Sequence, residues 1–160
     1  MRQSLQQHNR SDRLDGLGLG VWEPAAGRVL FAGANRPLWV LRGAEILEYA
    51  PTPRPLGGQP GRKVQSFDAS VHELAVGDRL LLFSDGVVDQ FGPTDPRRKR
   101  PLKWGTQRLR EFVLGHRHLP LAELSARFED DFRAWMGDQN QLDDCTWWCV
   151  ELPGAKSISA

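Results

Sequence analysis

Residues 79–89 have the sequence RLLLFSDGVVD, and this stretch decides the fold because an apolar run ends abruptly in an acidic residue and a glycine. The four large apolar residues that follow Arg79 are typical of a buried strand. A buried strand is rigid and the chain after it is accessible, so Asp85 is well placed for a functional site. The alternative is that Asp85 and Gly86 only form the turn of a hairpin.

The composition is that of an ordinary globular domain. The chain has 160 residues, enough for one domain with a hydrophobic core, and a net charge of +1, so no overall field attracts nucleic acid or a membrane surface. Its start is polar and no apolar run could span a membrane, so we expect a cytoplasmic protein. Cys145 and Cys149 are separated by roughly 13 Å of expected strand, too far for a disulfide.

The first half of the chain is expected to be a sheet. Short apolar segments separated by turn residues predict a meander of antiparallel strands at 17–22, 28–32, 38–41 and 45–49. A loop rich in proline and glycine follows at 50–63. Two further strands, 64–73 and 79–84, are expected to pair as a hairpin through a tight turn at 75–78.

The second half is expected to contain two helices and a final strand. Apolar residues at helical spacing predict helices over 106–114 and 121–135, and residues 145–152 form a strongly apolar strand. We interpret the basic run at 97–100 as part of an exposed loop; an anion-steering patch or a nucleic-acid contact is the alternative. His116 and His118 are interpreted as loop residues, although their spacing leaves a ligand role open.

Two acidic segments are expected to meet at one edge of a sheet. Asp85 follows one buried strand, and Asp143 and Asp144 precede another, so antiparallel pairing would bring them together. Converging carboxylates repel each other unless a proton or cation lies between them, and oxygen ligands suit Mg²⁺ or Mn²⁺. Two such ions can activate water for attack on phosphorus. A carboxylate pair for glycosidase-type acid–base chemistry is the alternative.

Four motifs in order resemble a known family. They are the sequences FAGANRPLW at 31–39, PLG at 55–57, GD at 77–78 leading to FSDGVVDQFG at 83–92, and DDCT at 143–146. Together they resemble the SpoIIE-like branch of the metal-dependent PPM (type 2C) serine/threonine phosphatases, over residues from about 15 to 152.

The resemblance implies an α+β fold, an α-β-β-α sandwich of antiparallel sheets with a two-ion Mg²⁺ or Mn²⁺ site at one sheet edge. Asp85 and Asp143 map onto metal ligands and are therefore the expected catalytic residues, with Gly86 and Asp144 as supporting neighbours. The implied reaction is hydrolysis of phosphoserine or phosphothreonine in a partner protein by metal-bound water. Family members act in bacterial signalling.

The chain departs from the family pattern because it lacks the earlier acidic residue and Gly-His-Gly-type turn. The resemblance therefore implies an incomplete sandwich that retains the two helices of the C-terminal half. We expect a polar stub at 1–14, a partial phosphatase domain at 15–152 and a disordered tail at 153–160. Apolar faces of residues 17–22 and of both helices should be uncovered.

The incomplete site leaves the activity open. We expect a phosphatase that is weak or inactive alone, with a partner or a missing N-terminal segment completing the fold. The alternative is a non-catalytic regulatory module that binds a signalling partner. No nucleic-acid partner and no membrane contact are expected.

Overall fold

The computed structural model describes residues 13–14, 16–57, 66–97 and 99–152, and these divide into two units. One unit comprises residues 1–38 and 49–73, and the other comprises 39–48 and 74–160. The expected disordered tail, most of the N-terminal stub and part of the 50–63 loop lie outside the described residues. In the described part of the chain, no helix is long and apolar enough to cross a membrane.

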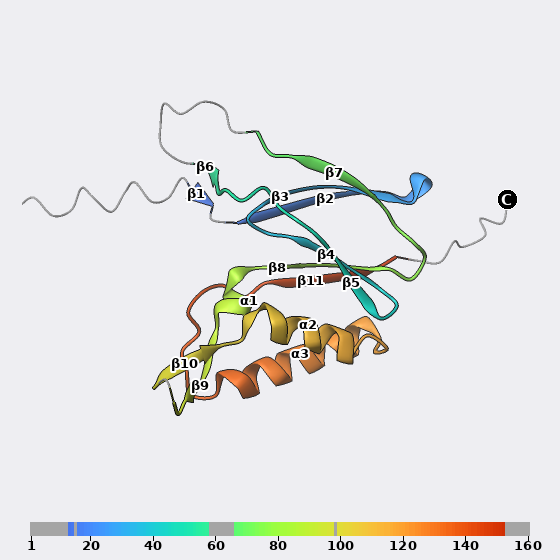
Figure 1. Ribbon diagram of the computed structural model, residues 1–160. Helices are drawn as coiled ribbons and strands as arrows, with labels where there is room; N and C mark the ends of the chain where they lie inside the picture. The colour runs from blue at the N-terminus through green and yellow to red at the C-terminus, as the bar shows by residue number, and fades with distance from the viewer. Residues whose placement is uncertain (1–12, 15, 58–65, 98, 153–160) are drawn as a thin grey trace, which may run out of the picture. The chain divides into compact units, whose positions relative to one another are not determined.

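The first unit contains a three-stranded antiparallel sheet in the order β2-β3-β7 (Figure 1). Its strands are β2 (Leu17–Glu23), β3 (Arg28–Ala34) and β7 (Ala69–Glu73), and a 3-10 turn at Pro24–Ala26 joins the first two. The short strands β1 (Arg13–Leu14) and β6 (Leu56–Gly57) pair separately.

One face of this sheet is apolar and exposed, as expected for residues 17–22. Leu19 is 60% exposed and Val21 49% exposed. Val21 on β2 lies opposite Leu30 on β3, and Leu30 lies opposite Val71 on β7. The side chains of Leu30 and Val71 are also exposed. The apolar sheet face, defined by Leu17, Leu19, Val21, Leu30 and Val71, is therefore continuous across all three strands.

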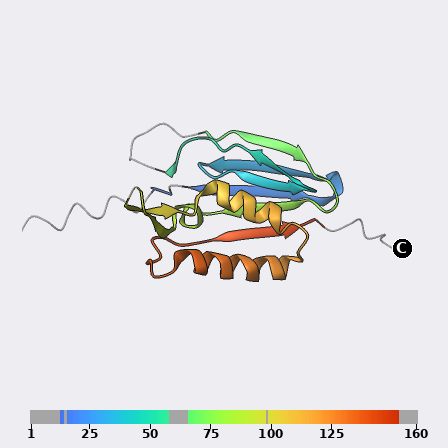
Figure 2. The same ribbon diagram turned by 60° about the horizontal axis from the view of Figure 1, so that its bottom comes forward.

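The second unit contains a four-stranded antiparallel sheet in the order β11-β8-β4-β5. Its strands are β4 (Leu38–Arg42), β5 (Glu45–Tyr49), β8 (Arg79–Phe83) and β11 (Trp147–Glu151). Two helices, α2 (Gly105–Gly115) and α3 (Leu121–Met136), run beside each other along this sheet (Figures 1 and 2). The α+β class, the antiparallel sheets and both C-terminal helices are confirmed.

The helix faces that were expected to be uncovered are buried, so that prediction is wrong. Phe112 on α2 and Phe128 on α3 pack with their ring centroids 5.6 Å apart, in one core cluster with Trp39 and Phe83 of the sheet. The apolar stripes of the two helices therefore cover the sheet of their own unit, and they need no other layer.

Two other expectations about strand pairing are corrected. The expected hairpin of 64–73 with 79–84 does not form, because β7 pairs with β3 while β8 lies between β4 and β11. Strand β8 is buried on both faces, which requires a central position, whereas β7 alternates and lies at an edge. The expected meander is also divided, because β3 and β4 belong to different sheets.

The chain around the basic run forms a hairpin of β9 (Phe91–Asp95) and β10 (Arg100–Lys103). Arg97 and Lys99 lie in its exposed turn, as expected, whereas Arg100 begins β10. Asp95 stabilises the turn of this hairpin. The Asp95 side chain accepts a hydrogen bond from the backbone N–H of Arg97, and the Asp95 carbonyl accepts one from the backbone N–H of Lys99, both at 2.8 Å. The prolines that favoured a loop are accommodated because a two-stranded ribbon has open edges.

Candidate metal centre

The two acidic segments lie at the same end of two neighbouring strands. Strands β8 and β11 are antiparallel, with Phe83 opposite Trp147 and Arg79 opposite Glu151. The end of β8 and the start of β11 therefore lie at one sheet edge, as predicted. Asp85 comes two residues after β8 ends.

Ser84 joins the two segments by hydrogen bonds. Its hydroxyl donates to the carbonyl of Asp144 at 2.8 Å and accepts from the backbone N–H of Thr146 at 2.9 Å. Its backbone N–H donates to the carbonyl of Thr146 at 2.8 Å. Each acidic segment is thus fixed to the other immediately beside the expected ligands.

The chain after Ser84 is neither a loop nor a hairpin turn, as sequence reasoning had considered, but a short helix, α1 (Asp85–Asp89). Gly86, the second residue of α1, lies against the backbone of the other segment. A Cβ atom at position 86 would be 2.9 Å from the carbonyl carbon of Asp144 and closer still to its oxygen. A glycine is required because only a residue without a side chain allows this approach.

The acidic side chains differ in exposure. Asp85 is half-buried, while Asp143 and Asp144 are exposed. One carboxylate oxygen of Asp143 accepts from the backbone N–H of Asp144 at 2.7 Å, which orients it. Burial, and then the charges of Asp143 and Asp144, raise the pKa of the neighbouring Cys145 thiol.

Gln90 positions the acidic loop, and sequence reasoning missed it. The side chain is completely buried. Its amide N–H groups donate to the carbonyls of Phe91 and Asn140, both at 3.0 Å, and its oxygen accepts from the backbone N–H of Leu142 at 3.3 Å. Gln90 therefore ties the end of α1 to the loop that carries Asp143. The sequence gives no signal for this role, since Gln90 simply follows the charged Asp89.

The donor set fits part of a site for a hard divalent ion. The two adjoining segments both carry carboxylates and backbone carbonyls, and such oxygens are the ligands that Mg²⁺ and Mn²⁺ prefer. Among the described residues, however, no group of three or more His, Cys, Asp or Glu side chains could hold a metal ion. The two segments supply fewer carboxylates than a complete dinuclear site would use.

The other polar candidates lie elsewhere. His116 follows α2 and its Nδ1 lies 2.9 Å from the carbonyl of Phe112, consistent with its interpretation as a loop residue. Cys145 and Cys149 are free thiols, as predicted.

Comparison with solved structures identifies the fold. The SiaA-PP2C domain of Pseudomonas aeruginosa is 24% identical with a TM-score of 0.73, over 84% of this chain and 50% of that one. The manganese-presoaked phosphatase domain of the cell fate determinant SpoIIE from Bacillus subtilis is 13% identical with a TM-score of 0.63, over 88% and 58%. The Mycobacterium tuberculosis serine/threonine phosphatase PstP is 18% identical with a TM-score of 0.54, over 84% and 58%.

The chain therefore has a PP2C-like fold and spans about half the length of these solved relatives. No curated protein matches it. The model of the family described as Stage II sporulation protein E (SpoIIE) matches residues 1–153. Because this match includes nearly all of the sequence, the chain belongs to the SpoIIE family.

Proposed function

We propose that this chain is the C-terminal portion of a metal-dependent phosphoserine/phosphothreonine protein phosphatase of the bacterial signalling type. The observation that carries the proposal is the junction at Ser84 and Gly86, which brings the Asp85 and Asp143 segments side by side. In a chain of the SpoIIE family, this arrangement favours a metal-dependent phosphatase over the glycosidase-type alternative.

In this proposal Asp85 and Asp143 are the metal ligands and catalytic residues, and they hold Mg²⁺ or Mn²⁺, two ions in the complete domain. When bound, the ions supply an acidified water and polarise the phosphoryl group. Ser84, Gly86 and Gln90 set the separation of the two ligand segments. The substrate is a phosphorylated cytoplasmic protein.

We further propose that the chain alone is weak or inactive. Among the described residues no group of three or more acidic, His or Cys side chains could hold a metal ion, and the SiaA domain that the chain resembles is about twice the length of the aligned part. The apolar sheet face is also exposed over five large side chains. A segment outside this sequence, or a partner, would supply the remaining ligands and cover that face.

A non-catalytic regulatory module is the second candidate, and the apolar sheet face favours it. Continuous exposed apolar surface of this kind marks interaction sites. Such a module would bind its partner with the same affinity after Asp85→Asn, whereas a phosphatase completed by that partner would lose metal binding.

Manganese binding tests the proposed ligands on the chain itself. Mn²⁺ is paramagnetic, so NMR line broadening should appear at the backbone amides of Ser84, Gly86 and Asp144 even if binding is weak. We expect Asp85→Asn or Asp143→Asn to raise the Mn²⁺ concentration needed for the same broadening by about tenfold or more, because each change removes a charged ligand. Asp130→Asn, on the exposed face of α3, is the matched control.

The proposal fails if Mn²⁺ broadens neither segment, or if Asp85→Asn and Asp130→Asn behave alike. Activity is then measured with a phosphothreonine peptide and Mn²⁺ on a protein that carries the additional half of the domain. Unchanged hydrolysis by Asp85→Asn in that protein would contradict the catalytic role even if Mn²⁺ binds.

A further inference from the structure

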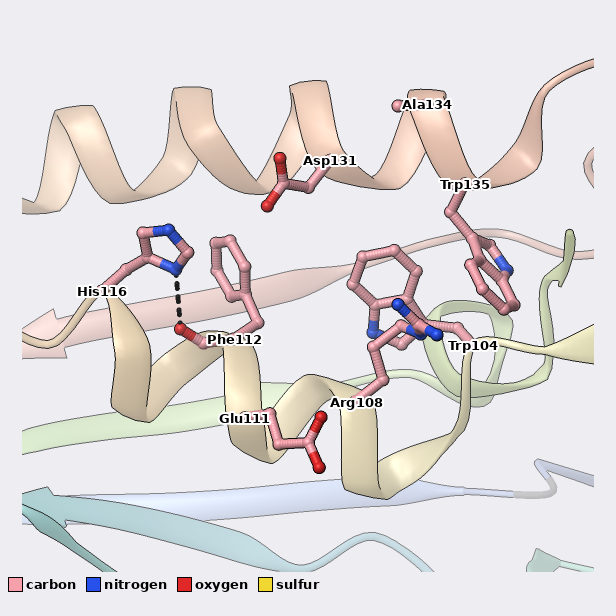
Figure 3. A pocket seen from close by; sticks show the side chains of 8 residues that line it. All are labelled: Trp104, Arg108, Glu111, Phe112, His116, Asp131, Ala134 and Trp135. Carbon is pink, nitrogen blue, oxygen red and sulfur yellow. Dashed lines mark hydrogen bonds between the residues drawn. The ribbon is translucent and has the colours of Figure 1, made fainter.

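A groove of about 320 Å³ lies between α2 and α3, within one unit and separate from the acidic segments (Figure 3). Its walls include the aromatic rings of Trp104, Phe112 and Trp135, together with the guanidinium of Arg108. Aromatic and arginine side chains in a concave site are the groups that contribute most to binding a partner.

Arg108 is held by aromatic rings rather than by a carboxylate. Its guanidinium carbon lies 4.0 Å from the ring centroid of Trp135 and 5.7 Å from that of Trp104. Figure 3 shows the guanidinium next to both indoles, whose ring centroids are 5.9 Å apart. The side chain is exposed, and it has no ion-pair partner in the part of the chain that the structure describes. Its charge is therefore available to an anionic group.

Trp104 contributes a second unused donor. The residue is 5% exposed, and its indole N–H has no acceptor among the described residues. By contrast, the indole N–H of Trp135 donates to the carbonyl of Gln90 at 3.4 Å. A buried N–H without an acceptor is destabilising, so a ligand that supplies one gains in affinity.

The two carboxylates in the groove have other partners. Asp131 pairs with Arg127 at 2.9 Å, and Glu111 accepts from the side-chain amide of Gln107 at 2.9 Å. Arg108 and the indole of Trp104 are thus the donors left for a ligand, and both favour an acceptor that carries negative charge. Glu111, whose partner is neutral, should oppose such a ligand weakly.

We propose that this groove binds a segment of a partner protein through an aspartate or glutamate side chain that is flanked by apolar residues. The ligand carboxylate pairs with Arg108, and the flanking residues pack on Phe112 and Trp135. Because Trp104 Nε1 has no exposed surface, neighbouring side chains must move on binding before this N–H can donate to the ligand. This role does not depend on the phosphatase assignment.

The test uses the 160-residue chain and three capped tripeptides, acetyl-Leu-Xaa-Leu-amide with glutamate, glutamine or lysine in the centre. Each is titrated to about 10 mM while the indole N–H signals are followed by NMR. The signal of Trp104, assigned with Trp104→Phe, should shift downfield with the glutamate peptide. Binding of the other two peptides should be weaker by about tenfold or more, since a charged acceptor is needed.

Variants complete the test. Arg108→Gln should weaken binding of the glutamate peptide by about tenfold or more, and Trp104→Phe should weaken it by several-fold, because each removes a donor. Glu111→Gln should tighten it by about twofold, since a like charge is removed. Arg133→Gln is the matched control because Arg133 is an exposed arginine of α3 that pairs with Glu129 and does not line the groove.

Three results would overturn the proposal. The first is no shift of the Trp104 signal with the glutamate peptide, and the second is equal binding of the glutamine peptide. The third is equal binding of free acetate, which would make the groove a simple carboxylate site with no use for a peptide. If Arg108→Gln does not fold, Arg108→Lys keeps the charge but loses the planar fork, and undiminished binding would then count against the proposed pairing.

Discussion

Replacing Gly86 by alanine should separate the two acidic segments. The added Cβ would be 2.9 Å from the carbonyl carbon of Asp144 and 3.3 Å from that of Asp143. The atoms it meets belong to the backbone, so no side-chain rotation relieves the clash. Either α1 or the loop before β11 must move.

The size of the effect follows from these contacts. Overpacking of a buried site costs about 1–3 kcal/mol. Movement of the loop would also stretch the two hydrogen bonds of the Ser84 hydroxyl, which contribute about 1 kcal/mol each. Alanine recovers about 1 kcal/mol because it favours the helix more than glycine does. We therefore expect Gly86→Ala to lower the free energy of unfolding by about 2–4 kcal/mol, a large share of a domain's stability.

Urea unfolding followed by tryptophan fluorescence measures this difference, with the slope against urea expected to stay constant. Gly115→Ala is the matched control, since Gly115 is also in a helix of this unit and a Cβ there meets no other atom within 4 Å. That variant should be neutral or more stable by up to about 1 kcal/mol. Equal stability of the two variants would show that the close approach of Gly86 does not hold Asp85 beside Asp143.

Two further predictions concern the same unit. Asp78 is 1% exposed and pairs with Arg42 at 2.6 Å, so Asp78→Ala should lower the free energy of unfolding by about 3 kcal/mol. The control Glu129→Ala breaks an exposed pair with Arg133 and should lower it by less than about 0.5 kcal/mol. Similar losses in the two variants would contradict the buried pairing. Burial raises the pKa of the Cys149 thiol to about 11, so about one thousandth of it is thiolate at pH 8. The rate of its alkylation should therefore rise about tenfold per pH unit until the pH reaches about 11. A rate that levels off near pH 9 would refute the raised pKa.

The paired strands beside the site could be predicted because their sequences allow few alternatives. Arg79–Phe83 and Trp147–Glu151 are short apolar runs, which favour strands. The first is central and buried, whereas the second lies at the edge of the sheet. Antiparallel pairing then places Asp85 and Asp143 at one edge. Their metal ligation stays a prediction, because backbone proximity does not itself define a coordination sphere.

The pairing of the other strands could not be predicted from local pattern. Residues 69–73 alternate and precede a tight turn, which is what a hairpin with β8 would also require. Burial determines which strands pair with β8, because a strand buried on both faces lies between two neighbours, here β4 and β11. Gln90 was hidden for a related reason, because the carbonyl of Asn140 that it binds lies 50 residues away in the sequence.

The two segments that carry the proposed ligands lie within one unit. Ser84, Gly86, Gln90 and Asp143 all belong to the unit of residues 39–48 and 74–160, whereas the apolar sheet face belongs to the other. The hydrogen bonds that set the ligand spacing therefore need no contribution from whatever covers that face. If a further segment or a partner supplies more ligands, as we propose, it adds them to a spacing that is already fixed. Weak Mn²⁺ binding by this chain and strong binding by a completed domain are then both expected from the same two carboxylates.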